Sequence, residues 1–400
     1  MEDDAGDKIF KNVRTTEEFY LNLSMVVGSK LDRYENTLVF IDEIQHYPQF
    51  LTMLKFLRQE HRYRFICSGS LLGIALKKTV SVPVGSIIPK KMYQLDFEEF
   101  LIANDFGEDA IAHLRQSFEQ KQPLAPAVHD KVLGLFKRYL LVGGMPDAVN
   151  EYLNSHNIVK VREVQEAIRE LYGVDASRYE EDAAKKLYIR RIYDMIPSQM
   201  ENKKKRIVAK DILDRKGDRF SNYVEEFEYL INSGITIPSH AISNPKYPLA
   251  ESQQKNLLKL YMNDVGMLTS QLYHYNIQPI LNDIASINLG SVYESAVAQE
   301  LKAHYEKLFY YDNKQKGEVD FLVDDSDTMS VLPIKVKSGK DYTVHSALDN
   351  LMAIQDYHIV SSIVLSNERE IKTKGNILYL PIYHVMFLEN KVPEEENLYF

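Results

Sequence analysis

Residues 38–43 read Leu-Val-Phe-Ile-Asp-Glu, a short apolar run that ends in two acids. A continuous apolar run of this length is typical of a strand that is buried on both faces of a parallel sheet. A helical pattern opens at Pro48 and carries apolar residues at positions 50, 54 and 57, and a second apolar run follows at residues 65–67. A strand, a helix and a strand in this order predict a βαβ unit with parallel strands.

Asp42 and Glu43 stand at the carboxyl end of the first predicted strand. P-loop ATPases place there an acid that helps to hold Mg²⁺, and a neighbouring Glu can polarise the attacking water. The second strand ends in Ser68-Gly69-Ser70, so its small polar side chains would face the γ-phosphate. A buried strand that runs into an acid is also common in proteins without such a site, and this structural alternative stays open on the pattern alone.

The composition is that of a globular protein with two or three domains. The 400 residues include 48 Lys and Arg and 57 Asp and Glu, which gives a formal net charge of −9. This charge argues against a protein that binds nucleic acid over most of its surface, but it permits a local basic groove. The single cysteine, Cys67, excludes an internal disulfide and a Cys-rich zinc site and favours the cytoplasm. The apolar runs are too short to span a bilayer, so no membrane contact is expected, and the acids after Met1 are unlike a signal peptide.

Patterns along the chain predict an α/β multidomain fold. Residues 1–155 alternate strand and helix, and a capping box at Asp96 and Glu99 begins one of the helices. Residues 156–286 are mostly helical, and two short helices around Gly217, followed by a Pro-rich extended segment, resemble a winged helix-turn-helix. Residues 287–395 read as a helix, three strands, a helix and two strands, and residues 396–400 resemble the remnant of a purification tag.

A second group of candidate site residues lies in residues 287–395. Glu294 on the helix, Asp320 on a strand and Lys337 on the next strand occupy the places of the PD-(D/E)XK nuclease arrangement, in which acids bind Mg²⁺ and the Lys positions water. The residue two before Lys337 is Lys335, where the pattern wants an acid. Residues two apart share a face of a strand, so an ammonium group would point at the metal position. A vestige in which Lys335 pairs with Asp320 is favoured over an active nuclease.

The winged-helix-like segment carries the wrong charge for reading DNA. Its second helix, residues 221–232, has three glutamates and no Lys or Arg, so phosphates would repel it. The basic residues at 203–206, 215, 216 and 219 could contact backbone phosphate, but a charge run is usually a solvated face. Nucleic-acid binding is therefore expected to be weak and independent of sequence, and packing against protein is favoured.

The chain resembles a prokaryotic family of AAA-type ATP-binding proteins that carry a C-terminal domain of unknown function. The resemblance covers nearly the whole chain and rests on the segments at residues 38–45, 54–56, 68–73, 83–85, 95–101, 143–146, 196–199, 260–266 and 317–321. It implies that Asp42 and Glu43 are the Walker B pair, with Asp42 on Mg²⁺ and Glu43 catalytic. It also implies that Ser68 or Ser70 is the polar sensor, and that the cofactors are ATP and Mg²⁺.

The motif Gly-x-x-x-x-Gly-Lys-[Ser/Thr], which cradles the phosphates, does not occur in the 400 residues, and Gly28-Ser29-Lys30 is the nearest string. A partial P-loop NTPase domain that binds ATP poorly and does not hydrolyse it is therefore expected. Two hypotheses stay open. One is an ATPase that is active in its intact form, and the other is a non-catalytic interaction protein with a protein partner or a second copy of itself.

Overall fold

The first strand and the helix after it form where the sequence predicts them. In the computed structural model, β1 (Leu38–Ile41) pairs in parallel with β2 (Arg64–Cys67), and α3 (Pro48–Glu60) connects them. The helix begins at Pro48, whose fixed φ suits a first helical position.

The structure describes residues 8–28, 37–69, 85–179, 182–202, 205–284, 287, 289–339 and 341–390. Contacts group the chain in two units, residues 1–92 with 232–234, and residues 93–231 with 235–400.

The prediction that the strand 38–41 is buried on both faces is wrong. Ile41 is buried, but Leu38 and Phe40 are 56% and 57% exposed, and Ile66 of β2 is exposed beside them. The core of this unit comes from α2 (Thr16–Val27) and α3, which cover one face of the two strands. No described residue of the unit buries the other face, so its alternate side chains stay in contact with solvent.

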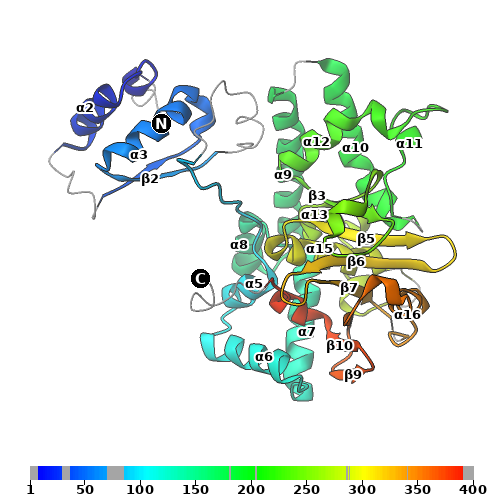
Figure 1. The fold of residues 1–400 in the computed structure, drawn as a ribbon. Helices are drawn as coiled ribbons and strands as arrows, with labels where there is room; N and C mark the ends of the chain where they lie inside the picture. The colour runs from blue at the N-terminus through cyan, green and yellow to red at the C-terminus, as the bar shows by residue number, and fades with distance from the viewer. Residues whose placement is uncertain are drawn as a thin grey trace, which may run out of the picture. The chain divides into compact units, whose positions relative to one another are not determined.

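Helices make up the first half of the second unit (Figure 1). The capping box at Asp96 and Glu99 is confirmed: each side chain accepts from the other residue's backbone N–H. None of the helices in the described part of the chain is both long enough and apolar enough to cross a membrane. The helices up to the sheet are α5 (Phe97–Ala103), α6 (Glu108–Gln120), α7 (Pro126–Val142), α8 (Pro146–Ser155), α9 (Ile158–Tyr179), α10 (Ala183–Glu201), α11 (Ala209–Leu213) and α12 (Val224–Asn232).

The rest of the unit is built on an eight-stranded sheet in the order β4-β3-β5-β6-β7-β8-β10-β9. The Pro-rich segment after α12 forms an antiparallel hairpin, and its first strand pairs in parallel with β5, so the hairpin extends the sheet of the C-terminal region. The predicted boundaries near residues 155 and 286 both lie within this unit. The strands are β3 (Thr236–Ile242), β4 (Gln253–Met262), β5 (Leu308–Asn313), β6 (Gly317–Asp325), β7 (Ser330–Lys337), β8 (Ser362–Ser366), β9 (Lys372–Lys374) and β10 (Ile377–Pro381), with helices α13 (Val265–Tyr273), α14 (Gln278–Leu281), α15 (Gly290–His304) and α16 (Ser346–Met352).

Candidate functional site

Asp42 and Ser68 meet at the carboxyl ends of β1 and β2. Parallel pairing in register, Ile41 opposite Cys67, brings the next residue of each strand to the same edge. The Ser68 hydroxyl donates to Asp42 Oδ1, and the backbone N–H of Ser68 donates to the Ile41 carbonyl at 2.9 Å. The Asp42 side chain is exposed, so the serine anchors one carboxylate oxygen while the group faces solvent. Ser70 lies outside the described residues.

Glu43 adopts a left-handed backbone conformation, with φ 51° and ψ 48°. This region is uncommon for residues other than glycine, and residues held in it recur at active sites as well as at the ends of helices. The backbone N–H of Glu43 donates to the Ser68 hydroxyl at 3.3 Å, and its carboxylate accepts from the Gln45 side chain. The turn therefore fixes both acids relative to the end of β2.

The oxygen donors at this edge suit Mg²⁺, which prefers carboxylate and hydroxyl oxygens and is usually held by one or two carboxylates together with phosphate. Asp42 supplies such an oxygen, and its contact with Ser68 fixes the direction of the carboxylate. When bound with ATP, Mg²⁺ would neutralise charge on the phosphates.

A cluster of buried charges occupies the predicted nuclease-like position in the second unit. It contains Glu294 from α15 and, from the neighbouring strand β6, Glu318 and Asp320. One carboxylate oxygen from each of these three acids lies within 4.8 Å of the other two, close enough for the three to share a metal ion. Hard divalent cations take such oxygen sets.

Lysine ammonium groups lie among these acids. Lys259 on β4 is fully buried, 3.1 Å from Glu294 Oε1 and 2.6 Å from Glu318 Oε1. Lys205, from the segment between α10 and α11, pairs with the other oxygen of Glu294. The ion pair expected between Lys335 and Asp320 is present, with Nζ 2.8 Å from Oδ1. Three cations therefore neutralise three carboxylates.

The electrostatics of the cluster follow from this pairing. Burial alone would raise the pKa of Glu294, but the ammonium groups of Lys259 and Lys205 hold it well below its ordinary value. Burial raises the pKa of Glu318, against the opposing effect of Lys259. Burial, together with the nearby Lys335 ammonium, lowers the pKa of Lys337. At neutral pH, Glu294 is ionised and holds its cations as internal counter-ions.

The sequence interpretation missed Lys259 and Lys205 as members of this cluster. Residues 257–262 read Leu-Leu-Lys-Leu-Tyr-Met, and a single charged residue in such an apolar strand is almost never buried without a partner. That signal could have identified Lys259. Tyr261, two residues on, donates its hydroxyl to Glu294 Oε1 at 2.6 Å. Lys205 could not be found in this way because its segment is charged throughout.

Three of the segments that carry the family resemblance meet at one buried junction. The backbone N–H of Gly144 donates to Asp264 Oδ2 at 2.6 Å. Asp264 is also the N-cap of α13, because its Oδ1 accepts from the backbone N–H of Met267. Leu95 donates its backbone N–H to the Gly144 carbonyl at 2.9 Å. A Cβ on Gly144 would lie 2.0 Å from the Leu95 carbonyl oxygen. These contacts hold the three segments in place, and they explain why an acid stands at Asp264 and a glycine at Gly144.

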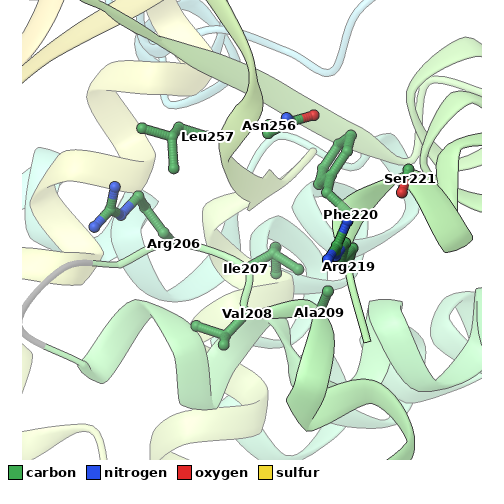
Figure 2. Close-up of a pocket in the computed structure, with 9 residues that line it drawn as sticks. All are labelled: Arg206, Ile207, Val208, Ala209, Arg219, Phe220, Ser221, Asn256 and Leu257. Carbon is green, nitrogen blue, oxygen red and sulfur yellow. The ribbon is translucent and has the colours of Figure 1, made fainter. Parts of the chain in front are cut away.

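A pocket of about 540 Å³ opens between the segment 206–209 and β4. Figure 2 shows Phe220 and Arg219 on one side of this pocket and Arg206 on the opposite side, with Ile207 between them. This volume falls within the usual range of small-molecule sites, about 300–1,000 Å³. Its lining residues are Arg206, Ile207, Val208, Ala209, Arg219, Phe220, Ser221, Asn256 and Leu257.

Comparison with protein-family models places three matches along the chain. Residues 4–101 match an AAA domain, residues 133–275 match a domain of unknown function (DUF8612), and residues 289–385 match another domain of unknown function (DUF4143). Neither a curated protein nor a solved structure matches the chain. The N-terminal region, which contains Asp42 and Glu43, is therefore similar to AAA domains, and α15 to β10 lie within the match to DUF4143.

Proposed function

We propose that residues 38–69 form the part of an AAA-type nucleotide site that holds the metal and the attacking water. The observation that supports this most directly is the contact of the Ser68 hydroxyl with Asp42 across two adjacent parallel strands. In this proposal Asp42 is the Mg²⁺ ligand, and Ser68 fixes its orientation. Glu43, held in a strained turn, orients and deprotonates the attacking water.

The 400-residue chain on its own is expected to bind ATP poorly. The phosphates need backbone amides, a helix N-terminus and a Lys, and the motif that supplies them does not occur in this sequence. Without it, several charge-assisted hydrogen bonds of about 1.5–3 kcal/mol each are lost, which weakens affinity by orders of magnitude.

A matched pair of proteins tests the proposal. Phosphate release from ATP is measured for this chain and for a version that carries a phosphate loop ahead of residue 1, each with and without Glu43→Gln. We expect turnover only in the longer protein, and its loss on Glu43→Gln. Hydrolysis by the 400-residue chain that Glu43→Gln abolishes would show that the site is complete without the loop. Hydrolysis by the longer protein that Glu43→Gln leaves unchanged would refute the role of Glu43.

The acid–lysine cluster is proposed to be structural, because an ammonium group stands at each acid that would otherwise bind a cation. The chain is therefore expected not to cleave DNA or RNA with Mg²⁺ or Mn²⁺. Cleavage that disappears on Asp320→Ala would contradict this. Lys335→Glu replaces a cation by a fourth acid and should raise the affinity for Mn²⁺ in calorimetry, whereas Lys374→Glu, an exposed change on β9, should not.

A second candidate is a non-catalytic interaction module, favoured by the exposed apolar face of β1 and β2. The partner proposed is a second copy of the chain. Sedimentation velocity should then show association that Phe40→Ser weakens, while Phe56→Ser, a change at a similarly exposed residue of α3, should weaken it less. A monomer at all concentrations would exclude this candidate.

A further inference from the structure

We propose that the pocket between residues 206–209 and β4, here called the β4 pocket, binds a nucleotide: an aromatic base carrying phosphate. The β4 pocket belongs to the second unit, and none of its lining residues takes part in the Asp42–Glu43 site. The proposal is therefore independent of the function proposed above.

An irregularity in β4 forms one wall of the pocket. His240 of β3 pairs with Leu258, but the next residue, Ala241, pairs with Gln254, so residues 255–257 of β4 have no partner in this ladder. Bulges of this kind occur often beside binding sites, where they redirect side chains. Here the bulge brings Asn256 and Leu257 into the lining. The opposite wall is held in place because Ile207 donates its backbone N–H to the Leu258 carbonyl at 3.1 Å.

An aromatic surface lies at one side of the pocket. Phe220 stacks on Phe227, with ring centroids 4.4 Å apart and planes at 9°. Phe227 is buried, whereas Phe220 is partly buried and lines the pocket, so Phe220 is the ring of this pair that a ligand can reach. Every nucleic-acid base has a planar π-face, and stacking of a base on an aromatic side chain is a common mode of recognition.

Two guanidinium groups supply the charge for phosphate. Arg219 is exposed and lines the pocket beside Phe220. Arg206 is largely buried and pairs with Asp312, Nη1 to Oδ2, at 3.4 Å. A guanidinium has five donors, so the ion pair with Asp312 leaves other donors of Arg206 able to bind an anion. The Asn256 amide can both donate to and accept from the edge of a base. A ring face, two guanidinium groups and an amide match the parts of a nucleotide better than those of an apolar ligand.

The test uses fluorescence anisotropy with two probes, fluorescein-labelled AMP and a labelled dT12 oligonucleotide, on the full chain. Arg219→Ala should weaken binding about tenfold, because it removes a charge-assisted contact. Arg215→Ala is the matched control: it is an exposed arginine four residues earlier that does not line the pocket, and it should change affinity less than about twofold. Phe220→Leu should weaken both nucleotides about tenfold yet leave competition by inorganic pyrophosphate unchanged.

The outcomes separate the sources of the ligand and the two sites. Binding of labelled AMP that depends on Arg219 identifies a free nucleotide as the ligand, and binding of dT12 alone, with the same dependence, identifies a nucleotide within a single strand. Equal losses for Arg219→Ala and Arg215→Ala, or no binding of either probe at millimolar protein, would overturn the proposal. So would nucleotide binding that Asp42→Asn abolishes and Arg219→Ala leaves intact, since that result assigns the binding to the Asp42–Glu43 site.

Discussion

At the scale of single residues, Lys259 shows why the acid cluster needs its internal cations. It is fully buried and bridges two carboxylates, those of Glu294 and Glu318. Ionised groups inside a protein are costly to leave without a partner, whereas a neutralised set can be replaced at little cost. The ammonium group of Lys259 therefore stabilises the fold chiefly by compensating the acids beside it.

Lys259→Met is expected to lower the free energy of unfolding by about 3–5 kcal/mol, because it keeps the bulk of the side chain and leaves buried carboxylates short of a cation. The combined change with Glu294→Gln should recover part of this loss. Urea unfolding of both variants measures the difference. A loss below about 1 kcal/mol for the single variant would mean that solvent reaches the cluster.

Asp264 gives the second unit a pH dependence. Burial raises the pKa of Asp264 to about 6, although backbone N–H groups of Gly144 and Met267 oppose the rise. Since the pKa is higher in the folded protein than in the unfolded chain, its contribution to stability is full below pH ~4 and is lost as the pH rises through ~6. This difference in the pKa of Asp264 between the folded and unfolded states corresponds to about 3 kcal/mol in the free energy of unfolding.

We expect Asp264→Asn to remove this pH dependence. The free energy of unfolding of the natural chain, minus that of the variant, should fall by about 3 kcal/mol between pH 4 and pH 7. Denaturant unfolding at several pH values tests this, with Asp147→Asn, an exposed acid on α8, as the control. Parallel curves for the natural chain and Asp264→Asn would show that Asp264 ionises as freely as it does in solvent.

At the scale of elements, the β1–α3–β2 unit and the order of elements from α15 to β10, apart from the short strand β9, could be predicted, because each depends on a local pattern of apolar residues. The exposed strand β9 reads Lys-Thr-Lys and carries no such pattern. Burial of β1 could not, since it depends on which elements cover the sheet. The pairing of β3 with β5 also escaped prediction because some 65 residues separate the two strands. The Lys335–Asp320 pair could be predicted because two-residue spacing and adjacent strands place both side chains on one face.

The junction between α7 and α13 depends on glycine. We expect Gly144→Ala to lower the free energy of unfolding by about 2–4 kcal/mol, because its Cβ would collide with the Leu95 carbonyl, a backbone atom that cannot easily move. Gly134 in the middle of α7 is the control. A Cβ there meets nothing within 4 Å, and Gly134→Ala should raise stability by about 0.5–1 kcal/mol. Thermal and urea unfolding measure the stability of both variants. Equal changes in the free energy of unfolding for Gly144→Ala and Gly134→Ala would contradict this expectation.

At the scale of the whole molecule, the chain divides into two units of unequal size, and each has its own hydrophobic core. The core of the N-terminal unit is the smaller one, and surface area buried on folding rises with size. The first unit is therefore expected to unfold first. The exposed, extended segment that contains Lys90 and Lys91 leads into the second unit.

Brief digestion with trypsin should cut at Lys90 or Lys91 and leave a stable fragment from about residue 91 to the C-terminal region. Calorimetry of the uncut chain should show two transitions, and the fragment should retain only the one at higher temperature. Lys90→Gln with Lys91→Gln should delay the cut. If calorimetry shows one transition for the uncut chain and none for the fragment, the second unit cannot fold alone.

The order of strands in the large sheet also matters while the protein is being made. A ribosome adds about 5–20 residues per second, so several seconds pass between the emergence of β3 and that of its parallel neighbour β5. Throughout that interval the nascent hairpin of β3 and β4 offers an unpaired row of backbone groups to any other chain nearby. A ribosome that stalls before residue 308 would hold this edge open, and cellular holdases that bind extended apolar segments would be drawn to it.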